Sequence, residues 1–347
     1  MSQVGRLMFS LLIVTALGVS AAAGPSGTQE PHEFLRAVGA FTGADLAALA
    51  SGEAVARVLD TDRREIAVIG AVRVNAPRDR LFERYRDVTG LGRSEAAVEV
   101  GIFGPTPREE DLRGLTFEDY DLETIRDCQP GDCGVRLSAN DMVRFQRGVN
   151  WRAPDWRDHA CSLWRRLLAG YAAGYMTGGN LALAEYRNKS QPLRVDEEFK
   201  ILFSESQYFR AGAPDFFRYM EDYPAAQLAG AENILFWSKE NFGMRPVLTI
   251  THQTLYTLPA GRVPPAPSAV IATKQIYATH YFDAALGLSL MFDDGDAGFY
   301  LLSVNRARTR SLSSFLRGFA RGQVQKRSHD ALQKLLRSTK LTLERRR

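Results

Sequence analysis

The chain has 347 residues, of which 45% are hydrophobic and 24% are charged, and its formal net charge at pH 7 is +4. This length fits one enlarged domain or two small ones, and the hydrophobic content is enough to build a buried core. So small a net charge does not provide a general phosphate-binding face, so nucleic acid is not an expected partner.

The first 23 residues have the features of a secretory signal peptide. Arg6 supplies the positive charge that opens such peptides, and residues 7–19 form an apolar run that is short for a bilayer span. Residues 21–23 are alanines and provide an Ala-x-Ala cleavage site. A membrane anchor is the alternative interpretation. We therefore predict a signal peptide at 1–23 and an exported protein, periplasmic or extracellular, at 24–347.

Two strands and a short helix are predicted next. Residues 53–59 and 65–74 alternate or run apolar, as strands do, and a polar turn joins them. An Asn-Ala-Pro step at 75–77 ends the second strand. Proline suits the first turn of a helix, and residues 79–87 carry apolar side chains on one side at helical spacing.

The middle of the chain, residues 94–236, has a mainly helical pattern. Large apolar side chains recur at helical spacing within 156–186, and residues 195–208 and 215–222 predict two further helices. We interpret 94–236 as an inserted helical subdomain or lid. Two independent domains are the alternative, but the strand-rich parts on either side are each too small to close a sheet alone.

Three cysteines lie in this middle region. Cys128 and Cys133 flank a Gln-Pro-Gly-Asp turn, and in an exported protein a local disulfide between them is the natural expectation. A metal site is the alternative, but the sequence offers no second Cys or His pair at a suitable spacing. Cys161 is predicted to be a free, small buried residue on a helix, and a reactive thiol is the alternative. We expect no cofactor and no metal.

The C-terminal region predicts antiparallel strands followed by a long helix. Residues 245–256 form a strand that places His252 and Tyr256 on one face. Residues 268–304 predict further strands, two of which are joined by an Asp/Gly turn. An amphipathic helical pattern then runs to residue 343, and a helix of this kind is suited to cover the apolar face of the strands. The predicted fold class is α+β, an antiparallel sheet packed on a long C-terminal helix.

Two segments carry a resemblance to a known superfamily. The sequence Val-Asn-Ala-Pro-Arg-Asp-Arg-Leu-Phe-Glu-Arg-Tyr-Arg-Asp at 74–87 resembles the opening of the START-like (SRPBCC) helix-grip superfamily, and residues 265–343 are similar to its closing half. This resemblance implies a curved, incomplete antiparallel sheet that grips the C-terminal helix around an apolar cavity. The helical stretch at 94–236 departs from that pattern.

A second resemblance is to a group of exported bacterial proteins of undetermined function. It is carried by a Cys-x-Pro-Gly-Asp-Cys segment at 128–133 and by a Lys-Gln-Ile-Tyr-Ala-x-His-Tyr-Phe segment at 274–282. This likeness implies no particular activity.

No established catalytic signature is present in the sequence. It contains no Gly-x-Ser-x-Gly elbow, His-Glu-x-x-His helix, Walker loop or Rossmann glycine fingerprint. The candidate ligand-binding residues are His252, Tyr256, Tyr277 and His280, all on predicted strands. Facing a common cavity, the two histidines would orient a ligand hydroxyl or carboxylate, or act as acid and base. The alternative is that each is a histidine satisfied within the sheet or at the surface.

Three functional hypotheses follow. The first is a binding protein that holds an apolar small molecule, lipid or isoprenoid-like, in a pocket between the C-terminal helix and the strands of His252 and Tyr277. The second is a cyclase- or hydrolase-like enzyme on the same scaffold, using His252 or His280. The third is a non-catalytic structural protein of the cell envelope. We favour the first, without a catalytic role.

The chain end is strongly basic. Residues 306–347 contain 13 Lys or Arg and two acidic residues, a net charge of +11. Arg317, Arg321, Lys326 and Arg327 avoid the apolar stripe of the predicted helix, so they are candidates for contact with anionic lipid headgroups. A solvated face that balances the acidic remainder of the chain is the alternative.

Overall fold

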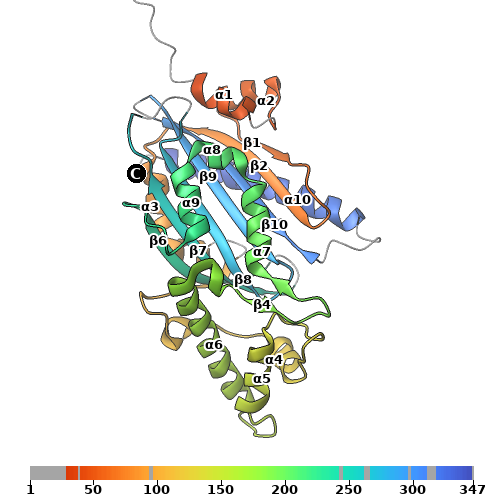
Figure 1. Cartoon of the computed structure of the whole chain (residues 1–347). Coiled ribbons are helices and arrows are strands. Elements are labelled where there is room, and N and C mark those ends of the chain that lie inside the picture. The colour runs from red at the N-terminus through yellow and green to blue at the C-terminus, as the bar shows by residue number, and fades with distance from the viewer. Residues whose placement is uncertain are drawn as a thin grey trace, which may run out of the picture.

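The protein is an α+β structure built on one eight-stranded antiparallel sheet (Figure 1). The computed structural model describes residues 29–37, 40–93, 97–241, 245–261, 266–295, 298–310 and 318–345. The strand order is β1-β2-β10-β9-β8-β7-β6-β3, so β1 and β3 are the edges. The strands are β1 (Val55–Val58), β2 (Glu65–Val74), β3 (Ala97–Ile102), β6 (Glu232–Glu240), β7 (Val247–Thr257), β8 (Ala269–Ala278), β9 (Ala284–Asp294) and β10 (Gly298–Arg308).

Helices cover both faces of this sheet. The long α10 (Gly318–Glu344) and the short α3 (Asp79–Arg86) lie behind it in Figure 1, and α7 (Val195–Ser204), α8 (Gln207–Gly212) and α9 (Pro214–Asp222) lie in front. At one end of the sheet stand α6 (Trp156–Gly178), α4 (Asp119–Arg126) and α5 (Ala139–Gly148), and α1 (Gln29–Ala37) and α2 (Gly43–Ala50) stand at the other.

The remaining elements are short connections. They are the 3-10 helices η1 (Val88–Arg93), η2 (Glu109–Leu112) and η3 (Gly179–Ala182), and the two-stranded ribbon of β4 (Glu185–Tyr186) and β5 (Leu193–Arg194). The region 156–186, where a helical pattern is predicted, contains one long helix: α6 ends at Gly178 and η3 begins at Gly179.

Alternate residues of the central strands belong to two separate hydrophobic clusters. On β10, Phe299 and Leu301 belong to the cluster that contains Leu332 and Leu336 of α10. Tyr300 and Leu302 belong to the cluster that contains the apolar residues of α6 to α9. Because side chains alternate between the faces of a strand, a central strand buried on both sides must be apolar along most of its length.

The contact between α10 and the sheet depends on a glycine in β2. A Cβ atom at Gly70 would lie 2.7 Å from Leu336 Cδ1 and 2.8 Å from the carbonyl oxygen of Val55. Any larger residue there would push α10 away from the strand, since 2.7 Å is well inside van der Waals contact. The predicted C-terminal helix therefore covers the sheet, and its position is set by this close approach.

The middle of the chain differs from the helical expectation at its two ends. Within 94–236, α4 to α9 are present, but β3 and most of β6 also fall in this range and pair with each other in the main sheet. The apolar core of β6, residues 234–237, is only four residues long. Such a short apolar run fits a buried strand or a helix equally well, so its periodicity does not distinguish the two.

The cysteine prediction is confirmed. Cys128 and Cys133 form a disulfide, and Cys161 is a free cysteine, partly buried on α6. The predicted signal peptide at 1–23 lies outside the described residues. In the part of the chain that is described, no helix has both the length and the apolar character needed to cross a membrane.

A pair of adjacent leucines tests the packing of α10. Leu336 is 1% exposed and Leu335 is 47% exposed. We expect Leu336→Ala to lower the free energy of unfolding by about 3 kcal/mol, because it leaves a cavity against β2. Leu335→Ala, the matched control, should change it by less than about 0.5 kcal/mol. Urea unfolding measures both, and equal losses for the two variants would contradict this orientation of the helix.

Candidate ligand-binding sites

A cavity of about 570 Å³ lies between the N-terminal half of α10 and the sheet. Val324 and Ser328 of α10 form one side of it. The opposite wall comes from β2, β8, β9 and β10, and includes Val68, Thr273, Gln275, Gly287, Asn305 and Ala307. The predicted pocket between the C-terminal helix and the sheet is therefore present.

The lining of this α10 cavity is less apolar than expected. Glu240 borders it, and burial raises the pKa of that carboxyl, which accepts a hydrogen bond of 2.6 Å from Ser238 Oγ. Gln275 Nε2 is buried and has no hydrogen-bond partner among the described residues. Polar groups of this kind, set in an otherwise apolar wall, orient a bound molecule and select for its own polar groups.

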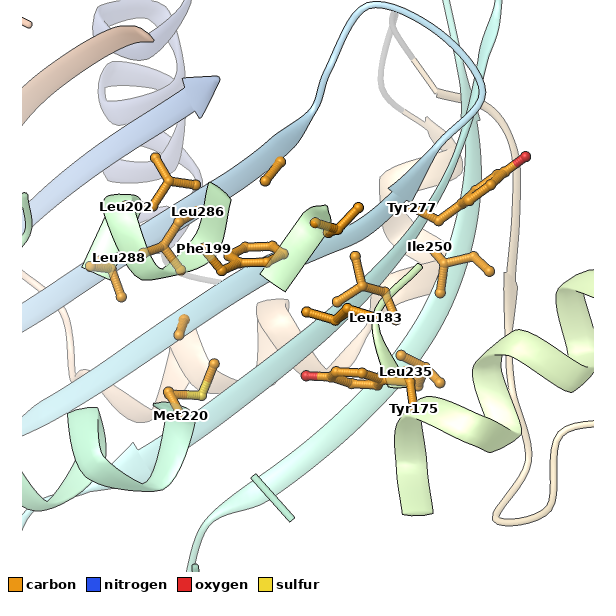
Figure 2. Packing of buried hydrophobic residues seen from close by; sticks show 14 of the residues in the cluster. Tyr175, Leu183, Phe199, Leu202, Met220, Leu235, Ile250, Tyr277, Leu286 and Leu288 are labelled. Carbon is orange, nitrogen blue, oxygen red and sulfur yellow. The ribbon is translucent and has the colours of Figure 1, made fainter. Parts of the chain in front are cut away.

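Three of the four predicted ligand-binding residues face away from the α10 cavity. For Tyr277 the cause is a β-bulge on β8: Ile250 pairs with Tyr277 and Thr251 pairs with Gln275, so Ile276 is an extra residue. In a regular strand, Tyr277 and Ile276 would lie on opposite faces. The bulge instead brings Tyr277 to the face covered by α6 to α9, where Figure 2 shows it near Ile250.

His252 is satisfied inside the protein. Its Nδ1 lies 2.8 Å from the hydroxyl of Tyr175 on α6, and its Nε2 lies 2.8 Å from Asn233 Oδ1. Burial, aided by the nearby Lys274, lowers the pKa of His252 to about 3. The ring is therefore neutral near pH 7, and both of its nitrogen atoms are engaged by protein groups. This geometry matches the structural alternative and gives no support to His252 as an acid or a base.

The two predicted tyrosines serve mainly in packing. The ring of Tyr256 stacks on Phe216 of α9 with centroids 6.1 Å apart. The hydroxyl of Tyr277 is buried without a hydrogen-bond partner among the described residues, and burial raises its pKa. Tyr277 borders a cavity of only about 40 Å³ between Tyr171 and Tyr186, which is too small for an organic ligand.

His280 lies at a different place, the turn between β8 and β9. Its Nε2 is 3.0 Å from Asp121 Oδ1 on α4. The two predicted histidines therefore do not face a common cavity. His280 borders a separate pocket of about 580 Å³ whose other lining residues include Arg136, Lys189, Arg245 and Arg310.

This basic pocket has one uncompensated donor. Arg136 is 7% exposed and pairs with Asp283, but its Nη1 has no hydrogen-bond partner among the described residues. Tyr281, whose φ of 57° is unusual for a residue other than glycine, borders both the basic pocket and the α10 cavity. The pocket thus offers an anion-binding surface beside the end of the α10 cavity.

A lysine that the sequence analysis overlooked lies next to His252. Lys274 pairs with His252 in the β7–β8 register and is 0% exposed. Its ammonium nitrogen donates a hydrogen bond to Asn180 Oδ1 and lies 4.7 Å from the ring centroid of Phe199 and 5.3 Å from that of Tyr175. No carboxylate among the described residues forms an ion pair with it. Burial lowers its pKa to about 7.

A sequence signal for Lys274 existed. It stands inside an apolar strand, two residues from Ala272 on the same face, where a lysine is rarely tolerated without a partner. Sharing a strand face with Ala272 does not by itself show that Lys274 is buried, because edge strands carry lysines at the surface. Only the helices that cover this face exclude water from it.

The amine lies close to a third cavity, of about 960 Å³, between α6, α7 and α9. Asn180, Phe199 and Phe203, which surround the amine, also line this cavity. Tyr223 and Lys200 also line it. In Figure 2, Tyr175 and Phe199 project from α6 and α7 over the sheet. The lysine is thus one side chain removed from a space large enough for a small molecule.

The predicted membrane-contact residues have different environments. Lys326 and Arg327 are exposed on α10, and Lys326 pairs with Asp330 at 2.7 Å. Arg321 donates a hydrogen bond of 2.8 Å to the carbonyl oxygen of Asp62, so it fixes α10 to the turn before β2. Arg317 lies outside the described residues.

No family model, no curated protein and no solved structure matches this chain. The class of protein is therefore defined by the fold alone: an α+β protein with a large antiparallel sheet and a long C-terminal helix.

The pH dependence of stability tests the state of Lys274. The unfolded chain keeps a proton on this amine up to about pH 10.5, whereas the folded protein releases it near pH 7. The unfolded state therefore binds more protons between these values, and stability rises with pH across that window. Relative to Lys274→Met, we expect the wild type to gain about 3 kcal/mol of unfolding free energy between pH 7 and about pH 9.5.

Lys200→Met is the matched control for this measurement, because Lys200 borders the same cavity but its side chain is 73% exposed. Its difference from the wild type should be the same at both pH values. Urea unfolding at each pH gives the free energies. Parallel curves for the wild type and Lys274→Met would show that the amine titrates as an ordinary lysine.

Proposed function

We propose that this protein binds an apolar small molecule, lipid or isoprenoid-like, in the α10 cavity. The observation that carries the proposal is the cavity itself, about 570 Å³ between the long C-terminal helix and the sheet. Small-molecule pockets are roughly 300–1,000 Å³ and combine an apolar wall with a few polar groups. Val68, Ala307 and Val324 supply apolar surface, and Gln275 and Glu240 supply polar groups.

The polar groups favour a ligand with one polar end. The donor on Gln275 Nε2, which has no partner among the described residues, can bind a ligand oxygen, and Glu240, whose carboxyl pKa is raised by burial, adds a second polar group to the wall. The basic pocket beside Tyr281 adds a position for an acidic end, since Arg136 and Lys189 line it. A long apolar body with a hydroxyl, carbonyl or carboxylate at one end therefore fits the arrangement best.

The START-like helix-grip scaffold is part of the same proposal. It is supported by the element order: β2, an Ala-Pro step at 76–77, α3, and a last strand that leads into α10. The ligand position also agrees, because helix-grip proteins hold ligands between the sheet and this helix. The layer of α7 to α9 on the other face is the departure from the compact pattern.

Export and membrane delivery complete the proposal. The segment at 1–23 supports export, and the exposed Lys326 and Arg327 support contact of α10 with anionic lipid headgroups. Such a contact would bring the helix that covers the cavity to the surface from which an apolar ligand comes. The basic side chains attract anionic lipids by about 1 kcal/mol each near the surface.

Filling the cavity tests the ligand site. Ala307 lines it from β10, and Ala307→Phe places a ring in the space. We expect the affinity for a fluorescent fatty-acid probe to fall by about tenfold or more, because the ring and the ligand compete for the same volume. Mass spectrometry of organic extracts from the purified wild type should also show an apolar molecule that the variant lacks.

Ala331→Phe makes the same substitution at an exposed position of α10 outside the cavity. It should bind the probe as the wild type does. Equal affinities for all three proteins, with no molecule in the extracts, would refute the proposal and favour a structural protein of the envelope.

Vesicle binding tests the membrane contact. The double variant Lys326→Gln/Arg327→Gln should lose about 2 kcal/mol of binding energy to phosphatidylglycerol vesicles in cosedimentation. Binding of the wild type should weaken as salt is added, since salt screens the attraction. Lys200→Gln/Arg218→Gln removes two exposed charges from α7 and α9 on the other side of the sheet and is the matched control. Equal wild-type binding to phosphatidylcholine vesicles would rule out an electrostatic contact.

A further inference from the structure

We propose that Lys274 is a carbonyl-reactive amine, which forms an imine with the aldehyde or ketone group of a small apolar molecule bound in the cavity between α6, α7 and α9. This site is distinct from the α10 cavity, because Lys274 lies on the opposite face of the sheet. The inference therefore goes beyond the proposed binding function and does not depend on it.

The amine of Lys274 is buried close to a cavity. Lys274 is 0% exposed, yet Asn180, Phe199 and Phe203 surround its nitrogen and also line a cavity of about 960 Å³. Asn180 both accepts the hydrogen bond of the amine and lines the cavity, and its amide nitrogen donates a hydrogen bond to the carbonyl oxygen of Glu221 on α9. A ligand carbonyl that displaces the oxygen of Asn180 takes its place beside the amine.

The surroundings of the amine favour its neutral form. Aromatic ring faces favour a cation, and Tyr175, Phe199 and Phe203 lie within 6 Å of the nitrogen. Burial without a carboxylate among the described residues opposes the cation and dominates, so the pKa falls to about 7. Roughly half of the molecules then carry a neutral amine at pH 7, against less than about one in a thousand for an ordinary lysine. A desolvated lysine of this kind is a nucleophile.

The titratable neighbours do not supply a competing charge at the amine. His252 on β7 is neutral near pH 7, and burial raises the pKa of the Tyr175 hydroxyl. The charged groups of the cavity lie on α7 and α9, namely Asp196, Lys200, Glu221 and Asp222. Asp196 pairs with Lys200, and Glu221 pairs with Arg210.

The reaction balances without a cofactor. The neutral nitrogen adds to the carbonyl carbon, the carbon–oxygen π bond breaks, and one proton moves from nitrogen to oxygen to give a carbinolamine. The hydroxyl then leaves with the second nitrogen proton as water, and the carbon–nitrogen double bond forms. One carbonyl compound and one lysine thus give one imine and one water, with no change of oxidation state.

Reductive trapping tests the proposal on the full chain. The wild type is mixed with hexanal at pH 7 and treated with sodium cyanoborohydride, which converts any imine to a stable hexyl-lysine. Peptide mapping by mass spectrometry then gives the extent of labelling at each lysine. We expect Lys274 to be labelled at least about tenfold faster than Lys200, which is exposed at the same cavity and serves as the internal control.

Two variants separate reactivity from access. Lys274→Met should lose the fast label and keep the slow labelling of Lys200. Asn180→Ala should speed the label at Lys274, because it opens the path from the cavity. The peptide map of the wild type compares labelling of Lys274 with that of Lys200 in one sample. This comparison tests the proposal even if a variant fails to fold.

Labelling of Lys200 and other exposed lysines with Lys274 unmodified would overturn the proposal. Ala307→Phe, which fills the α10 cavity, should leave the labelling of Lys274 unchanged. A loss of fatty-acid binding in that variant with normal labelling at Lys274 would separate the two sites, so failure of one proposal is distinguishable from failure of the other.

Discussion

The structure depends on the burial of both faces of one antiparallel sheet. A sheet face that is covered by helices excludes water, so each polar side chain on it must find a partner within the protein. His252 finds Tyr175 and Asn233, and Lys274 finds Asn180. The lysine finds no carboxylate counter-charge among the described residues, so its charge on this face is compensated only by a neutral amide and by aromatic rings. Burial beneath α6 to α9 therefore lowers the pKa values of His252 and Lys274.

Ion pairs at one end of the sheet hold the covering helices in place. Arg308 at the end of β10 bonds Glu198 of α7 at 2.6 Å and also pairs with Glu65 of β2. Arg64 in the turn before β2 reaches Glu198 and Asp283. Removal of one partner from such a buried network leaves an uncompensated charge, which costs several kcal/mol. The network thus fixes α7, and with it Phe199, against the sheet.

The two faces of the sheet differ in how completely they are filled. On the side of α7 to α9, aromatic rings pack closely around Lys274, and the open space begins behind Asn180. On the side of α10, the contact is tight at Gly70 and opens toward Val324, where the α10 cavity lies. A helix that meets a sheet closely at one point and diverges from it at another leaves space between them. This geometry is the physical basis for a ligand site beneath α10.

The sequence by itself determined the fold class, most strands and the disulfide. Alternating and apolar runs predicted β2, β7 and β10, and the spacing of Cys128 and Cys133 around a tight turn favoured their pairing, because these signals are local. Only the tertiary structure decided which face each residue uses. The bulge at Ile276 reversed the expected face of Tyr277, since one extra residue inverts the alternation of all that follow. The tertiary structure also brings Asn180, Phe199 and Lys274 together from distant parts of the chain. Local sequence patterns contain no information about such long-range contacts.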